Sequence, residues 1–159
     1  MSPTHASAQQ LPRGVLLTPL RRIAHPKGDI VHGMKAGDAG YQGFGEAYFS
    51  HILPGQTKGW KRHRSMVLNL LVVDGEVDFH LVAEDGDPPV RLRIDALSPA
   101  RLTVPAGLWM AFAAVGDRPG LVLNLASLPH DPDEAEQAEL DRFALPAPSS
   151  ATAPAGARR

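Results

Sequence analysis

The chain has 159 residues, no cysteine, and 16 basic against 17 acidic side chains, which gives a net charge of −1. This length corresponds to about one domain. The lack of cysteine excludes a disulfide scaffold, a thiolate metal site and a cysteine nucleophile. The balanced charge provides no overall positive field that would attract nucleic acid. With 15 glycines and 15 prolines, the chain is either rich in turns or partly disordered.

Both ends have a composition typical of disorder. Residues 1–14 show no apolar periodicity, and residues 146–159 are dominated by Pro, Ala and Ser, which bury little apolar surface. The sequence therefore predicts one domain over residues 15–145 between two disordered segments. No secretory signal pattern is present, and the longest apolar run, Leu70 to Val73, is far below the roughly 20 residues of a membrane span. We expect a cytoplasmic protein without a membrane partner.

The central region is a series of short strand-like segments separated by turn residues. In residues 76–83, Val77, Phe79 and Leu81 alternate with Asp78 and His80, which predicts a strand with one buried face and one exposed face. Asp74-Gly75 is a hairpin signal between two apolar runs. Strands are predicted over residues 46–53, 66–73, 76–83, 90–94, 101–104, 108–115 and 121–126, and this spacing indicates an all-β sandwich or barrel.

A short helix is predicted near the C-terminus. Asp131 can cap it, Pro132 suits its first turn, and Glu134 stands three residues after the cap. Residues 133–143 then consist largely of good helix formers. We expect this helix to pack on the sheet.

The best candidate for chemistry is His63, within the basic run Lys61-Arg62-His63-Arg64. Such a cluster would suit a diphosphate; the alternative is a solvated charge run at the end of a strand. Lys58 is a second candidate for phosphate binding.

Four further residues are candidates for lining a binding pocket. Glu46 shares one face of its strand with Tyr48 and Ser50. Asn69 and Asn124 are polar residues within apolar strands, so each either lines a cavity or satisfies a buried hydrogen bond. Trp109 could stack on a base or sugar, with core packing as the alternative.

Two half-motifs in order indicate the fold. Residues 59–75, which contain His63, are followed by the turn Pro105-Ala106-Gly107, and this arrangement resembles the cupins. The resemblance implies an all-β cupin, a double-stranded β-helix (jelly-roll) barrel, here with a short C-terminal helix. Metal-binding cupins carry further histidines, whereas this chain has Met110 at the place of the last one. One imidazole and one thioether do not make a first-row metal site, so no metal is expected.

Residues 58–63 (KGWKRH), 101–109 (RLTVPAGLW) and 124–132 (NLASLPHDP) resemble dTDP-4-dehydrorhamnose 3,5-epimerase-like proteins, over about residues 15–143. The resemblance implies a nucleotide-sugar substrate, a homodimer and no cofactor. It also implies a histidine base paired with an aspartate, a lysine that stabilises an enolate, and a tyrosine acid. The base matches His63 if two residues are inserted after Gly59, and its position falls on Lys61 without that gap. The lysine position falls on Leu68, the aspartate position on Phe79 beside Asp78, and the tyrosine position around Leu123-Asn124.

The function implied is a cofactor-free epimerase of a nucleotide-linked 4-keto-6-deoxy sugar, serving polysaccharide biosynthesis. Two alternatives stay open. The chain could be a non-catalytic module that binds a sugar nucleotide. It is also similar to the dTDP-sugar 3,4-ketoisomerases, which would have histidines at both Lys61 and His63.

Overall fold

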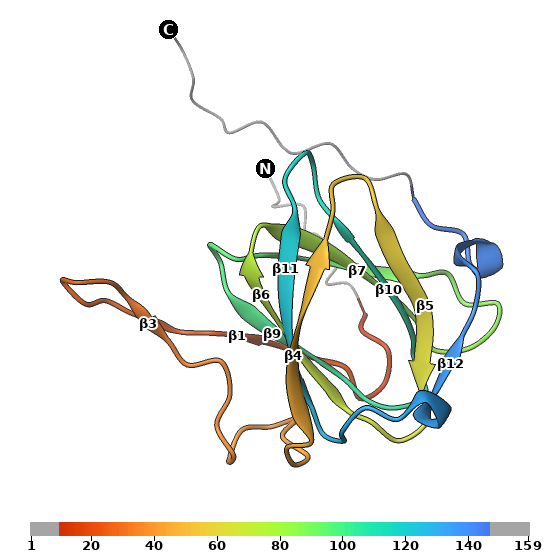
Figure 1. Cartoon of the computed structure of the whole chain (residues 1–159), viewed down its shortest axis with the longest axis horizontal. Coiled ribbons are helices and arrows are strands. Elements are labelled where there is room, and N and C mark those ends of the chain that lie inside the picture. Colours follow the sequence, from red (N-terminus) through yellow and green to blue (C-terminus); the bar gives the residue numbers. More distant parts are fainter. Residues whose placement is uncertain (1–9, 147–159) are drawn as a thin grey trace, which may run out of the picture.

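The computed structural model describes residues 10–146, which fold into two five-stranded antiparallel sheets (Figure 1). The all-β prediction is confirmed. Most of the two segments expected to be disordered falls on residues 1–9 and 147–159, outside the described range. No helix within residues 10–146 has the length and apolar character needed to cross a membrane.

The strands of the first sheet follow the order β1-β9-β6-β11-β4, and those of the second follow β12-β5-β10-β7-β8. The first sheet contains β1 (Leu16–Pro19), β9 (Ala100–Val104), β6 (Leu68–Asp74), β11 (Gly120–Ala126) and β4 (Glu46–Ile52). The second contains β12 (Ala135–Gln137), β5 (Thr57–His63), β10 (Trp109–Ala114), β7 (Glu76–Val82) and β8 (Val90–Asp95). A separate pair, β2 (Arg22–Ile23) and β3 (Ile30–Val31), projects from the first sheet (Figure 1).

The core lies between the sheets, where the alternating strands turn their apolar faces inward. Val77, Phe79 and Leu81 on β7 are fully buried, as their period of two predicts. Leu102 on β9 faces them from the other sheet and is also fully buried. Burial of such side chains is the main stabilising contribution to the fold.

The turn at Asp74-Gly75 does not form the predicted hairpin. It joins β6 to β7, which lie in different sheets and pair with other strands. Gly75 has a positive φ of 78°, and a Cβ there would lie 2.5 Å from the carbonyl oxygen of Pro119. The turn signal is correct, but the chain uses it to cross between the sheets.

The predicted C-terminal helix is wrong in all but its first turn. Asp131 caps a single 3₁₀ turn, η1 (Pro132–Glu134), by accepting a 2.9 Å hydrogen bond from the Asp133 amide. The next residues form β12, and a second 3₁₀ turn, η2 (Leu140–Arg142), follows. Because β12 pairs with the edge of β5, tertiary hydrogen bonding outweighs the local helix preference.

His80, expected on an exposed face, is only 5% exposed. Leu145 and Pro146 from the end of the described chain lie close to it, with Asp78 alongside. Burial lowers the pKa of His80. Both faces of β7 are therefore covered.

Candidate active site

A cavity of about 230 Å³ lies between the two sheets. The exposed residues Tyr48 and Lys58 are part of its wall, so it is open to solvent on that side. Among the described residues that line it are two lysines and a histidine, and none is acidic. The lining consists of Tyr48, Ser50, Lys58, Gly59, Lys61, His63, Leu68, Leu70, Met110, Phe112, Val122 and Asn124.

Three of the predicted residues, Lys58, Lys61 and His63, line this cavity from β5, which has a β-bulge between the two lysines. Lys58 pairs with Phe112 and Lys61 pairs with Met110, so residues 58–61 lie opposite residues 110–112 of β10. The extra residue lets Lys58 and Lys61 face the same side although they are three positions apart. Gly59 has a φ of 139°, and a Cβ there would lie 2.6 Å from the Cβ of Ala111. Glycine is therefore needed for this close approach.

His63 forms the central contact of the site. Its Nδ1 lies 2.5 Å from Oε2 of Glu134, and both side chains are 10% exposed. The backbone brings them together, because β12 pairs Ala135 with His63 and the Arg64 amide donates to the Glu134 carbonyl. Since Nδ1 is occupied by the carboxylate, Nε2 is the nitrogen available to a ligand.

Glu134 is held in the ionised form. Its other oxygen, Oε1, accepts hydrogen bonds from the backbone amides of Ser65 at 2.8 Å and Met66 at 2.7 Å. Burial opposes ionisation, but the hydrogen bonds from His63 and the two amides outweigh it and lower the pKa of Glu134 to about 2. The family resemblance places the acidic partner of His63 at Phe79, with Asp78 one residue away. Asp78 instead accepts two hydrogen bonds from Arg93, at 2.8 and 2.9 Å.

A second polar pair lies on the first sheet. Tyr48 on β4 is the direct cross-strand neighbour of Asn124 on β11, and Nδ2 of Asn124 donates to the tyrosine hydroxyl at 2.9 Å. Asn124 is 2% exposed, and its Oδ1 has no hydrogen-bond partner in the described part of the chain. The sequence predicts that Tyr48 shares a strand face with Ser50, but it gives no sign that Tyr48 lies beside Asn124. The missing information was the register between β4 and β11.

The two lysines differ in their contacts. Nζ of Lys58 donates a 3.0 Å hydrogen bond to Oγ of Ser50, which ties β5 to β4 across the open side. Lys61 lies two residues before His63, on the same face of β5, and points into the cavity. Their ammonium groups make the cavity suitable for an anionic ligand.

The other basic residues of the run face away from the cavity. Arg62 binds Glu136 at 2.5 Å and lies 4.7 Å from the ring centre of Trp109. Arg64 binds the same carboxylate at 3.0 Å. Trp109 packs with Phe143 on the outer face of the second sheet. The structure therefore separates Arg62 and Arg64 of the predicted basic cluster from Lys61 and His63, which line the cavity.

Asn69 and Glu46 also lie outside the cavity. Asn69 donates to the carbonyl of Gly40 and accepts from the hydroxyl of Thr103 at 2.6 Å, so it satisfies a buried hydrogen-bond network on the outer face of β6. Glu46 begins β4 opposite Ala126 and does not contribute to the cavity wall. Of the two asparagines proposed from the sequence, Asn124 alone lines the cavity.

The donor set of the cavity does not fit a metal ion. Among the described residues that line it are one imidazole, of His63, and one thioether, of Met110, but no carboxylate or thiolate and no second imidazole, which are the usual ligands of a first-row metal. Within residues 10–146, no three His, Cys, Asp or Glu side chains gather in an arrangement that could hold a metal. The chemistry that the arrangement supports is proton transfer by His63 beside ammonium groups.

Known structures share the fold of this chain, and one of them is also similar to it in sequence. A dTDP sugar isomerase from Desulfovibrio desulfuricans G20 is 32% identical, with a TM-score of 0.74 over 81% of this chain and 86% of that one. NovW, a 4-keto-6-deoxy sugar epimerase from Streptomyces spheroides, is 19% identical, with a TM-score of 0.74 over 89% and 79%. The predicted cupin fold of the epimerase-like type is confirmed.

Among curated proteins, a probable low-salt glycan biosynthesis epimerase, Agl13 of Haloferax volcanii, is 22% identical over 97 residues. The match spans 57% of this chain and 62% of that protein. No protein-family model matches the chain.

Proposed function

We propose that this chain, which belongs to the family of the dTDP-sugar isomerases, is a cofactor-free epimerase of a dTDP-linked 4-keto-6-deoxy sugar. The observation that carries the proposal is His63, which lines a cavity together with two lysines and is held through its Nδ1 by Glu134 behind the cavity wall. The names of the similar proteins, a dTDP sugar isomerase and a 4-keto-6-deoxy sugar epimerase, support the substrate class.

In the proposed reaction, Nε2 of His63 removes a proton from the carbon next to the ketone. The electrons of the C–H bond form a C=C bond, and the carbonyl π electrons move to oxygen, which gives an enolate. Glu134 stabilises the imidazolium that results and fixes the ring through Nδ1. Protonation of the enolate on the other face of the carbon completes the inversion.

Lys61 is the proposed stabiliser of the enolate oxygen. Lys61 lines the cavity two residues before His63 on β5, and a cation aimed at a developing oxyanion stabilises the transition state. Lys58 stands at the open side beside Ser50. We propose that it binds the diphosphate of the nucleotide, as a point charge that needs no fixed geometry.

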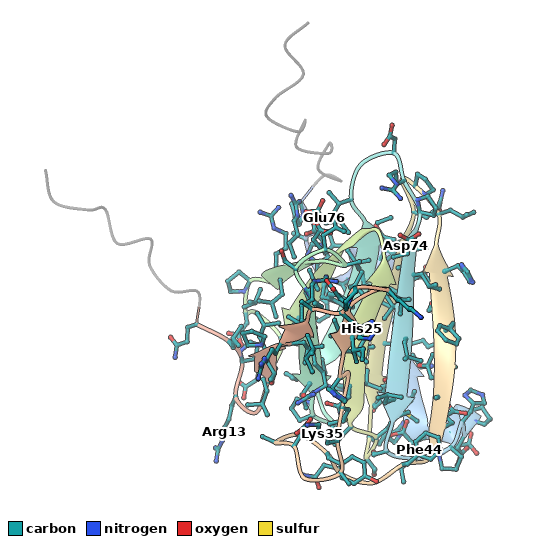
Figure 2. The ribbon with its side chains drawn as sticks, turned by 90° about the vertical axis from the view of Figure 1, so that its left-hand side faces the viewer. Arg13, His25, Lys35, Phe44, Asp74 and Glu76 are labelled. Atoms are coloured by element: carbon teal, nitrogen blue, oxygen red, sulfur yellow. The ribbon has the colours of Figure 1, made fainter. Side chains whose placement is uncertain are left out.

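A homodimer is also proposed, because an apolar strip follows the edge of the first sheet. Phe49 on β4 is 60% exposed, and its cross-strand neighbour Leu123 also faces away from the cavity. Figure 2 looks onto this outer face, with β4 at one edge and Phe44, 67% exposed, at its end. A second copy would cover such a strip and the open strand edge. Elution as a monomer in gel filtration at micromolar concentration would contradict the dimer.

The function is tested by incubating the protein with dTDP-4-keto-6-deoxyglucose and identifying the product by NMR. An epimerase yields the 4-keto sugar inverted at C3 or C5. A 3,4-ketoisomerase yields a 3-keto sugar, and a binding module returns the substrate unchanged although it binds. Either of the last two results would overturn the proposed reaction.

A further inference from the structure

We infer that residues 143–146, at the end of the described chain, form a pH-operated strap. The strap closes on the outer face of the second sheet while His80 is neutral, and it opens when this histidine is protonated. The switch is separate from the proposed reaction, because neither His80 nor any residue of the strap lines the cavity of His63.

The strap covers an aromatic cluster on the outer face of the second sheet. The ring centre of Phe143 lies 5.1 Å from that of Trp60, edge to face, and 6.1 Å from that of Trp109. Phe143 is 8% exposed, and Leu145 packs against the same cluster. Residues 143–146 belong to none of the strands of the described chain, so packing of side chains rather than a strand ladder holds them in place.

His80 is the titratable group beneath the strap. It lies on the outer face of β7, is 5% exposed, and borders a space of about 10 Å³ that Leu145 and Pro146 also line. Its Nδ1 has no hydrogen-bond partner among the described residues. A protonated imidazole carries a proton on both ring nitrogens. Protonation under the closed strap would therefore add a charge in a covered space, with no protein acceptor for Nδ1 among those residues, and this is unfavourable.

The charged groups around His80 come from two strands. Asp78 lies on the same face of β7, and Arg91 of β8 is the direct cross-strand neighbour of His80. Asp78 favours the protonated ring, but both of its oxygens already accept hydrogen bonds from Arg93, at 2.8 and 2.9 Å. Arg91 disfavours it. The residues that line the space from β5, β10 and the strap are uncharged: Thr57, Ala113, Ala114, Leu145 and Pro146.

These surroundings set the direction of the switch. Burial is the largest influence on His80 and lowers its pKa below the ordinary value of 6.5, and the repulsion of Arg91 acts in the same direction. When the strap is open, water reaches the ring and the pKa returns toward 6.5. The open form therefore binds the proton more tightly. Closure is fully favoured above pH 6.5 and weakens as the pH falls toward the lower pKa of the closed form.

The switch is tested by tryptophan fluorescence of the full chain between about pH 8 and 5, the range in which histidines titrate. Trp60 and Trp109 are the two tryptophans of the sequence, and both contact Phe143. Opening should therefore shift the emission to longer wavelength and increase its quenching by acrylamide. We expect a reversible shift with a midpoint below pH 6.5 in the wild type, and no shift in His80→Gln, whose side chain does not titrate.

His25→Gln is the matched control, because His25 is exposed in the turn between β2 and β3 and lies away from the strap. It should keep the wild-type shift. Leu145→Ala is a second variant, which weakens the packing of the strap without changing a titratable group. Its shift should move to higher pH, because less protonation is then needed to open the strap. This variant keeps the test decisive if His80→Gln does not fold.

Four results would overturn the strap. They are constant emission of the wild type over this pH range, a wild-type shift in His80→Gln, loss of the shift in His25→Gln, and a shift of Leu145→Ala at the same pH as the wild type. Far-ultraviolet circular dichroism of the wild type should stay constant across the transition. A loss of this signal together with the shift in emission would show unfolding of the domain instead, and would overturn the strap as well.

Discussion

His63 and Glu134 are 71 positions apart in the chain, yet Nδ1 of His63 lies 2.5 Å from Oε2 of Glu134 at the end of β5. The short strand β12 produces this contact, because it aligns the segment after Glu134 with the C-terminal end of β5 (Figure 1). The carboxylate is fixed on its other side by the amides of Ser65 and Met66. The imidazole is therefore held in one orientation before any substrate binds.

Glu134→Gln should lower kcat by about 10²-fold, because the amide cannot compensate the charge of an imidazolium. Binding of dTDP, measured by calorimetry, should stay at the wild-type level, since Glu134 does not line the cavity. Glu136→Gln is the matched control, because Glu136 contacts Arg62 and Arg64 on the outer face. Equal kcat values for the two variants would count against a role for Glu134 in positioning the base.

The same carboxylate should make stability depend on pH in the acid range. Its folded pKa of about 2 lies below the ordinary value of 4.5, so its contribution is fully present above pH 4.5 and is lost as the pH falls toward 2. At 1.36 kcal/mol per pKa unit, the contribution is on the order of 3 kcal/mol. Urea unfolding between pH 6 and 2 should therefore show a steeper loss for the wild type than for Glu134→Gln, and parallel curves would refute this.

Lys61→Met and Arg62→Met should have opposite consequences, although the residues are neighbours on β5. Lys61 points into the cavity, so its loss should lower kcat by about 10²–10³-fold through the enolate. Arg62 pairs with Glu136 and contacts Trp109 on the outer face, so its loss should cost up to about 1 kcal/mol of stability with kcat unchanged. Steady-state kinetics and urea unfolding on both variants measure this, and a larger kcat loss for Arg62→Met would reverse the assignment.

Asn69→Ala and Asn124→Ala should have different effects, although the sequence allows the same two roles for both asparagines. Asn69 holds Gly40 and Thr103 by hydrogen bonds away from the cavity, so the variant should lose about 1–3 kcal/mol of stability and keep its kcat. Asn124→Ala should instead lower kcat, because it releases Tyr48. The two losses are compared by urea unfolding and by turnover of folded protein at 25 °C. Catalytic loss in Asn69→Ala without loss of stability would contradict this division.

The strands could be predicted because their apolar residues alternate with a period that burial between two sheets enforces. Val77, Phe79 and Leu81 lie where that pattern places them. The prediction from this pattern is wrong for β12, whose partner strand β5 lies far away in the chain. Residues 135–137 prefer a helix locally, and the free edge of β5 draws them into a strand instead.

The site could be predicted only in part for the same reason. His63 and the two cavity lysines belong to one local run, whereas the alternation of β5 turns Arg62 outward, and Arg64, just after the strand, binds the same Glu136 carboxylate. Glu134 and Tyr48 join the arrangement through pairings with β5 and β11. Neither pairing leaves a signal in the neighbouring sequence, and the family resemblance places the acidic partner at Phe79, beside Asp78.

The most direct test of His63 as the base is deuterium uptake from solvent into dTDP-4-keto-6-deoxyglucose, followed by NMR for the wild type and His63→Ala. We predict that the wild type incorporates deuterium at C3 or C5, and that the rate in His63→Ala falls by about 10²–10⁴-fold. Uptake at the same rate in His63→Ala, or no uptake by the wild type, would contradict the central claim.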